Sequence, residues 1–167
     1  MTPEQALARL QRQCSKAEYC CGQVRKKLQR WSLGNAAAGK ASFTSAQIES
    51  IVEALQKEKF VDDARFANAY VRDKARFSKW GSTKISYNLR GLGVDAQTVK
   101  DALAGNAALF EGDTLVKLLE TKCRSLVKEE PVAKKREKLI RFALGRGFGY
   151  EQVREAVDKV IFSIFAD

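Results

Sequence analysis

The feature that most constrains the fold of this chain is a helix-start pattern that occurs three times. Each copy has an apolar residue before a helix-capping position and a second apolar residue five positions after the first, at Phe43-Thr44 with Ile48, Val94-Asp95 with Val99, and Phe148-Gly149 with Val153. Apolar residues at this separation pack together across the start of a helix. Each copy continues with another apolar pair, at Ile51 and Val52, Ala102 and Leu103, and Ala156 and Val157. We interpret the chain as an internal repeat of helical units.

A basic amphipathic helix is expected before each of these starts. Its apolar residues recur at helical spacing, at Val24, Leu28 and Trp31, at Ile85 and Leu89, and at Leu139, Phe142 and Ala143. One more helix should lead each unit, over residues 3–13, 63–78 and 112–127. Capping boxes support this interpretation, with Thr2, Pro3 and Gln5 at one helix start and Ser15 with Glu18 at another.

The predicted fold is all-α, with three tandem three-helix repeats built like helix-turn-helix units. Their expected boundaries are residues 1–60, with a connector loop at 32–42 after a helix that ends near Trp31, then 61–107 and 108–167. A unit of about 50 residues buries too little apolar surface to be stable alone. We therefore expect the units to stack into a short, elongated, curved solenoid.

The middle unit carries the sharpest helix pattern. Asp62 and Asp63 suit a helix N-terminus, because their carboxylates can accept hydrogen bonds from its unpaired amides. Three aromatic residues follow on one stripe that should face the core, at Phe66, Tyr70 and Phe77. Four basic residues form a separate face that should be exposed, at Arg65, Arg72, Arg76 and Lys79. Gly81 then ends the helix.

Composition narrows the classes of function. The chain has 30 Lys and Arg residues against 20 Asp and Glu, a net charge of +10, which favours an anionic partner. It has no histidine, which excludes Ser-His and Cys-His catalytic pairs and His-containing zinc sites. The four cysteines lack C-x-x-C spacing, so we expect reduced core thiols in a cytoplasmic protein. We expect no catalytic residue, metal, cofactor or membrane span.

Two local motifs suggest other functions. The segment GNAAAGKAS, residues 34–42, resembles a phosphate-binding loop, but Ala41 stands where a magnesium-binding Ser or Thr is needed and no hydrophobic strand precedes it. Residues 83–103 resemble a DNA-binding helix-turn-helix, but phosphate contacts alone carry no sequence information and the second helix has few base-reading groups. We interpret the first as a connector and the second as part of the repeat.

The segment FVDDARFANAYVRDKARFSKWG with the following KISYNLRGLGV, residues 60–94, resembles the central region of the RecX family. Weaker likenesses are LIRFALGRGFGYEQVREAV, residues 139–157, and CSKAEYCCGQVRKKLQRW, residues 14–31. The resemblance implies a non-enzymatic protein of the SOS response and DNA repair that binds RecA recombinase filaments on single-stranded DNA. It would limit filament extension or promote the loss of filaments, and would thereby lower ATP hydrolysis, strand exchange and cleavage of the LexA repressor by RecA.

The partner should meet the basic helix faces, because no basic tail carries the charge. We predict contacts from Arg25, Lys27, Arg30, Arg65, Arg72, Arg76, Lys79, Trp80, Lys84, Arg90, Lys134, Lys138 and Arg141. The expected partners of this monomer are the RecA filament and single-stranded DNA. One alternative is a protein that acts by occupying DNA, which the charge and the interleaved Phe77 and Trp80 favour. Another is an enzyme using the 34–42 loop, whose ATP binding would disappear on Lys40→Ala.

Overall fold

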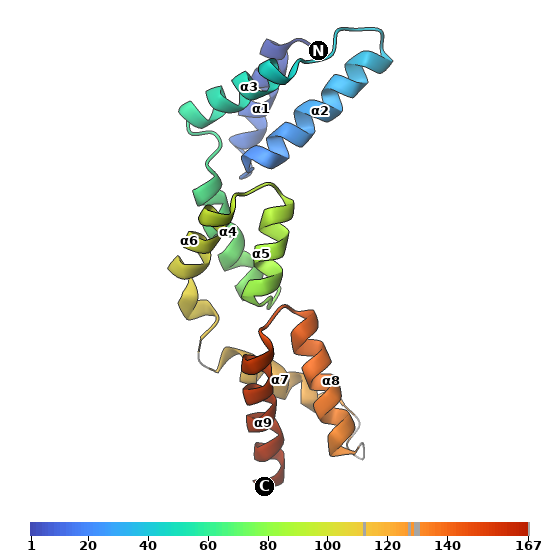
Figure 1. The fold of residues 1–167 in the computed structure, drawn as a ribbon, viewed down its shortest axis with the longest axis vertical. Coiled ribbons are helices and arrows are strands. Elements are labelled where there is room, and N and C mark those ends of the chain that lie inside the picture. Colours follow the sequence, from blue (N-terminus) through green and yellow to red (C-terminus); the bar gives the residue numbers. More distant parts are fainter. Residues whose placement is uncertain (112, 127, 129–130, 167) are drawn as a thin grey trace. The chain divides into compact units, whose positions relative to one another are not determined.

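A computed structural model describes residues 1–111, 113–126, 128 and 131–166, and within these ranges every regular element is a helix (Figure 1). The α-helices are α1 (Pro3–Cys14), α2 (Cys21–Ala37), α3 (Ser45–Lys57), α4 (Asp63–Arg76), α5 (Ser82–Gly91), α6 (Ala96–Gly105), α7 (Thr114–Arg124), α8 (Val132–Gly145) and α9 (Tyr150–Ala166). A short 3-10 helix, Ala107–Leu109, follows α6. The predicted all-α fold of three-helix groups is confirmed.

The chain forms two compact units, and the middle group of helices is divided between them. The first unit contains Met1–Ala67 and Leu89–Val99. The second contains Asn68–Asn88 and Lys100–Asp167. Each unit therefore holds one whole three-helix group and one end of the α4–α6 group.

In the first unit, α1 and α2 pack on α3 around an aliphatic core. Its fully buried residues include Leu10, Leu28 and Leu55. Capping boxes start α1 at Thr2 and α3 at Thr44, where each hydroxyl accepts an amide hydrogen bond from the glutamine three residues later. The predicted staple residues Phe43 and Ile48 are both buried, which explains how the chain enters α3 at a fixed angle.

Two details of the first group differ from the prediction. Ser15 ends α1 rather than starting a helix, and α2 begins at Cys21, with the Cys20 amide bound to Gln23 Oε1 at 3.1 Å. Helix α2 also continues to Ala37, so the expected end near Trp31 and the connector at 32–42 are wrong for residues 32–37. Buried Asn35 favours the extra turns, because its side-chain amide donates to the carbonyls of Met1 and Ala41 at 2.8 and 3.1 Å.

In the second unit, α7 and α8 pack on α9. Their core is again aliphatic, with Leu119, Leu139 and Val157 fully buried. The staple residues of this group, Phe148 and Val153, are buried as well. The leading helix was expected over 112–127, and residues 112 and 127 lie outside the described part of the chain.

Helix α4 begins as predicted and buries only part of its aromatic stripe. Asp62 caps it, since its carboxylate accepts the Arg65 amide at 2.9 Å. Phe66 is buried and Tyr70 half-buried, but Phe77 is 82% exposed, so the prediction that it faces the core is wrong. Helix α4 ends at Arg76, so Phe77, the last residue of the predicted stripe, lies just beyond it. There the chain turns back through Lys79, whose φ is 54°, and the Trp80 amide donates to the Lys74 carbonyl at 3.1 Å.

Each unit contains a close junction between the second helices of neighbouring groups. In the first unit, the turn that follows α5 meets the start of α2, where Cys20 Sγ donates to the Leu92 carbonyl at 3.4 Å. In the second unit, the turn that follows α8 meets the start of α5, where the Gly81 amide donates to the Arg146 carbonyl at 2.7 Å. Carbonyls in the turn after one helix thus accept hydrogen bonds from the start of the second helix of the preceding group, which satisfies groups that a helix end leaves unpaired.

Candidate partner-binding surface

Six of the basic side chains predicted to meet a partner are held by contacts inside the chain. Three are arginines paired with carboxylates, Arg25 with Glu49 at 2.8 Å, Arg65 with Glu18 at 2.8 Å, and Arg141 with Glu137 at 3.0 Å. The hydrogen bond from Arg25 lowers the pKa of the Glu49 carboxyl below its ordinary value and raises the pKa of Arg25 itself. Solvent screens exposed pairs of this kind, so they reduce the local charge more than they stabilise the fold.

The other three are lysines with polar or aromatic neighbours. Lys27 Nζ donates to Gln13 Oε1 at 3.0 Å and lies 4.5 Å from the centroid of the Tyr19 ring. Lys84 Nζ donates to the Gly145 carbonyl at 3.2 Å, and Lys138 also interacts within the chain. These lysines have structural roles in addition to any role toward a partner.

Trp80 is half-buried and lies between two lysines. Its ring centroid is 4.9 Å from Lys74 Nζ and 4.6 Å from Lys84 Nζ, so both ammonium groups face its π-system. Nearby, Arg146 Nη1 donates to the Ser78 carbonyl at 2.6 Å. Trp80 therefore forms part of the packing of the α4–α5 turn, and its contact with a partner remains a prediction.

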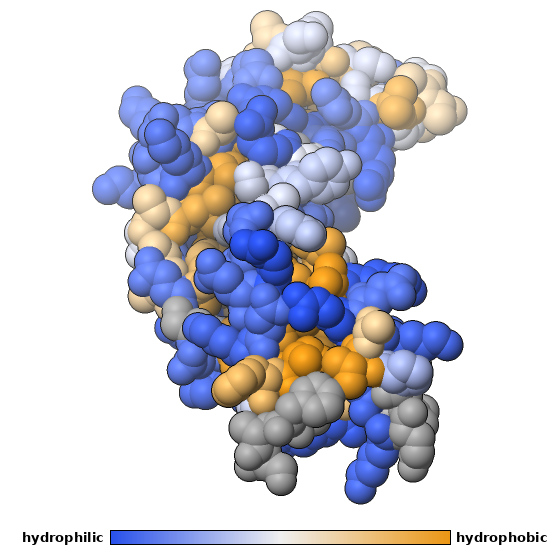
Figure 2. All heavy atoms as spheres, turned by 60° about the horizontal axis from the view of Figure 1, so that its bottom comes forward, coloured by the Kyte–Doolittle hydropathy of each residue, from blue (hydrophilic) through white to orange (hydrophobic). Residues whose placement is uncertain are grey.

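The remaining six cations are exposed, and none of their side chains forms a hydrogen bond or ion pair with another described residue. They are Arg30, Arg72, Arg76, Lys79, Arg90 and Lys134. Figure 2 shows that hydrophilic side chains cover much of the face in view, with apolar side chains between them. Because an unpaired exposed cation gives up no internal contact on binding, these six are the better candidates for an anionic partner.

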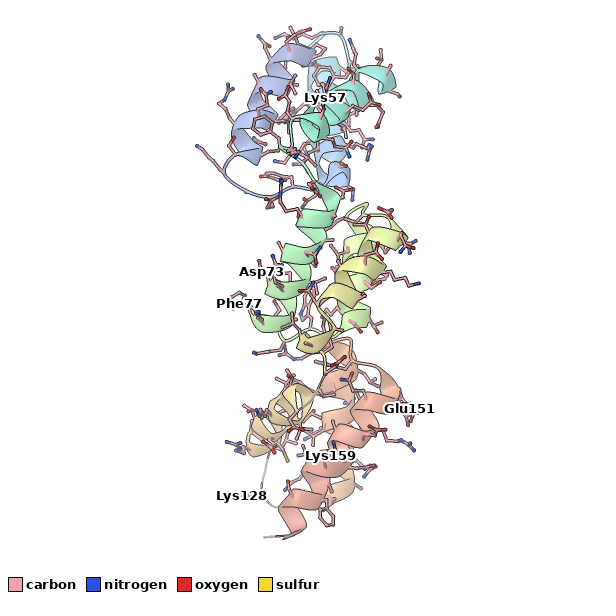
Figure 3. All side chains as sticks on the ribbon, turned by 90° about the vertical axis from the view of Figure 1, so that its left-hand side faces the viewer. Lys57, Asp73, Phe77, Lys128, Glu151 and Lys159 are labelled. Atoms are coloured by element: carbon pink, nitrogen blue, oxygen red, sulfur yellow. The ribbon has the colours of Figure 1, made fainter. Side chains whose placement is uncertain are left out.

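Phe77, which the sequence pattern placed in the core, lies instead on the outer face at the end of α4, among exposed charged residues. Residues four apart share a helix face, which places Arg72 with Arg76 and Asp73 with Phe77 on adjoining rows. Figure 3 shows Asp73 and Phe77 on the same side of α4. All four side chains are exposed. Within unit 2, an exposed phenyl ring therefore lies beside two unpaired guanidinium groups.

The third group also carries basic hollows that sequence reasoning missed. One has a volume of about 650 Å³ and is lined by Glu120, Cys123, Arg124, Leu126, Lys128, Lys135, Val160 and Ser163. A smaller one of about 350 Å³ is lined by Lys122, Leu126, Lys138, Arg141 and Phe142. The lysines and arginines come from different helices, so no single helical face of the sequence reveals the grouping.

The segment that resembles a phosphate-binding loop cannot cradle a phosphate in this conformation. Residues 34–37 form the last turn of α2, and the amides of Ala38, Gly39 and Lys40 donate to carbonyls of that same turn. A phosphate loop needs those amides to be free. In the helix-turn-helix candidate, Asp95 caps the start of α6 by accepting hydrogen bonds from the Gln97 amide and from both the amide and the hydroxyl of Thr98. The Thr98 hydroxyl, one of the few groups there that could read a base, is therefore already hydrogen-bonded within the chain.

The cysteines are free thiols, with Cys20 and Cys21 buried and Cys14 and Cys123 half-buried. Burial raises the pKa of the Cys21 thiol to about 12, and the neighbouring Asp63 carboxylate acts in the same direction. In the part of the chain that the structure describes, no three Cys, Asp or Glu side chains come together as metal ligands. No helix there is both long and apolar enough to cross a bilayer.

Comparison with known proteins identifies the family. Residues 62–103 match the model of the second three-helix domain of RecX, and residues 111–157 match the third. Regulatory protein RecX of Clostridium tetani is 31% identical over 122 residues, which are 72% of this chain and 56% of that protein. The Clostridium acetobutylicum protein of the same name is 32% identical over 124 residues, with the same shares of each chain. The chain thus spans about half the length of these curated relatives.

Solved structures agree on the fold. The crystal structure of RecX from Lactobacillus salivarius covers 95% of this chain and 96% of its own, with a TM-score of 0.75 and 20% sequence identity. A second crystal structure of regulatory protein RecX has a TM-score of 0.77 over 94% of this chain and 71% of its own. The two domain models together match more than half of the residues, and the chain belongs to the RecX family.

Proposed function

We propose that this protein regulates a RecA recombinase by binding its filament on single-stranded DNA and limiting filament extension. ATP hydrolysis, strand exchange and LexA cleavage by the filament then fall together, because all three depend on filament length. Membership of the RecX family carries the proposal. The protein acts as a cytoplasmic monomer and has no chemistry of its own.

The exposed cations support an electrostatic contribution to this binding. A RecA filament carries the phosphates of its DNA, and unpaired arginines such as Arg72 and Arg76 attract an anionic assembly at long range. A single-stranded DNA contact of the chain itself is the second candidate, which exposed Phe77 beside these arginines favours.

The direct test is RecA-dependent ATP hydrolysis on single-stranded DNA with increasing amounts of the protein. Hydrolysis should decrease, and Arg72→Glu with Arg76→Glu should shift the inhibition curve to higher concentrations without loss of helical circular dichroism. The double variant Arg12→Glu with Arg154→Glu, which makes the same change in charge on exposed arginines outside the predicted contacts and the hollows, serves as the control. Hydrolysis that stays constant over a wide range of concentrations would refute the proposed function.

A further inference from the structure

The outer face of α4 brings an exposed aromatic ring together with two unpaired arginines and an exposed carboxylate, whereas exposed Tyr87 on α5 has one unpaired arginine, Arg90, one turn away. Phe77 is 82% exposed, whereas Phe66 on the same helix is 7% exposed. Single exposed aromatic residues are common on protein surfaces, and Phe162 is a comparable case at 76%. Exposure alone therefore does not mark Phe77 as functional.

The charged neighbours of Phe77 distinguish it. Arg72 and Arg76 lie on the adjoining row of the helix, and neither guanidinium forms an ion pair with any described residue. Asp73 is exposed beside them, and its carboxylate is likewise left without a partner in the described residues. Several other exposed arginines are paired, for example Arg141 with Glu137 one turn away, whereas Arg30 and Arg90 share the unpaired state. Arginine and aromatic residues, phenylalanine included, are enriched in protein interfaces, where a few such side chains carry most of the binding energy.

We infer that this face of α4 is a protein-binding hot spot in which Phe77 enters an apolar recess of the partner while Arg72 and Arg76 meet carboxylates at its edge. The inference rests on the proposed function, since it takes the protein surface of the RecA filament as the partner. It assigns the contact energy to Arg72, Arg76 and Phe77, at the C-terminal end of α4 and just after it, and gives the opposing surface a defined chemistry.

Asp73 favours a protein over a nucleic acid as the occupant of this face. Along the helix it lies between Arg72 and Arg76, and a carboxylate in that position repels a continuous phosphodiester chain. A protein surface of mixed charge accommodates it, because complementary groups can be placed residue by residue. The face is also convex and helical, a shape that fits a recess.

The test compares four proteins: the unsubstituted chain, Phe77→Ala, Phe77→Leu and Phe162→Ala. Each is titrated against RecA filament assembled on a single-stranded oligonucleotide with a slowly hydrolysed ATP analogue, and separately against the bare oligonucleotide. Phe77→Ala should weaken filament binding by about tenfold or more, the size typical of an interface hot spot. Phe77→Leu should restore much of the affinity, because an apolar recess accepts an aliphatic side chain. Phe162→Ala should bind like the unsubstituted chain.

The outcomes separate the inference from the function on which it rests. Filament binding unchanged by Phe77→Ala overturns the inference and leaves the regulatory function standing. Loss of bare-oligonucleotide affinity in both Phe77→Ala and Phe77→Leu also overturns it, because base stacking needs a flat ring and the occupant is then nucleic acid. Absence of filament binding by the unsubstituted chain overturns both proposals. Since Phe77 is exposed, all variants should keep the unfolding temperature of the parent.

Discussion

The junction inside the first unit predicts that Gly22→Ala destabilises the protein, although alanine is the better helix former. Gly22 is the second residue of α2, where the turn after α5 comes closest. A Cβ atom there would lie 2.0 Å from the Leu92 carbonyl oxygen and 2.9 Å from the Gly93 Cα atom. Both neighbours are backbone atoms, so no side chain can rotate to make room, and the two segments must move apart.

The size of the effect follows from two opposing contributions. Replacing glycine by alanine inside a helix stabilises by about 1 kcal/mol. Overpacking costs typically about 1–3 kcal/mol, and contact with a fixed backbone carbonyl belongs at the upper end. The net result should be a loss of about 1–2 kcal/mol, which for a chain of this length lowers the unfolding temperature by about 2–8 °C.

Gly34→Ala provides a matched control in the same helix. Apart from its chain neighbours and the backbone of its own helix turn, no atom lies within 4 Å of a Cβ atom at this position, so only the helix preference should act. The unfolding temperature should rise by about 2–4 °C, and both variants can be measured by circular dichroism at 222 nm during heating and in urea. Equal stabilisation by the two substitutions would show that the close approach at Gly22 does not exist in solution.

Two further predictions concern the core. Phe66→Ala should lower the free energy of unfolding by about 3–5 kcal/mol in urea titrations, because Phe66 is buried, and a loss no larger than that of exposed Phe77→Ala would contradict its placement. The Cys21 thiol has its folded-state pKa raised to about 12 from an ordinary value of 9.0, so its contribution to stability is complete below pH 9 and is lost as the pH rises toward 12. The unfolding temperature should therefore fall between pH 9 and pH 11, and Cys21→Ala should reduce that fall; identical pH profiles would contradict the role of this thiol.

Local signals in the sequence predicted the helices well where local contacts determine them. The capping boxes at Thr2 and Thr44 and the three staples involve residues within five positions of one another, so their chemistry is visible in the sequence. The end of α2 was missed because it depends on Asn35, whose hydrogen-bond partner Met1 is 34 residues away. A contact over that distance has no local pattern.

Contacts between residues far apart in the sequence also decide which of the predicted partner-binding cations are unpaired. Helical spacing placed Arg65 and Arg72 on a basic face, and both are exposed. It could not show that Arg65 pairs with Glu18, 47 residues away, while Arg72 stays unpaired. Helical spacing also could not show that Phe77 lies beyond the end of α4. The same spacing is found for aromatic residues in the core and for exposed ones. Charge and periodicity identify candidates, and tertiary contacts decide which remain available.

The two junctions explain why glycines recur in the second and third groups. Gly93 and Gly147 occupy equivalent turns after α5 and α8, with φ values of 94° and 86° that favour glycine. In each junction a lysine donates to the carbonyl two residues earlier, Lys26 to Gly91 at 3.1 Å and Lys84 to Gly145 at 3.2 Å. Lys26 is the sixth residue of α2, whereas Lys84 is the third residue of α5. The two junctions therefore share the accepting glycine carbonyl and not the position of the lysine that donates to it. The Gly-x-Gly turn is therefore the element that joins neighbouring groups, and its absence from α2 agrees with that helix running on to Ala37.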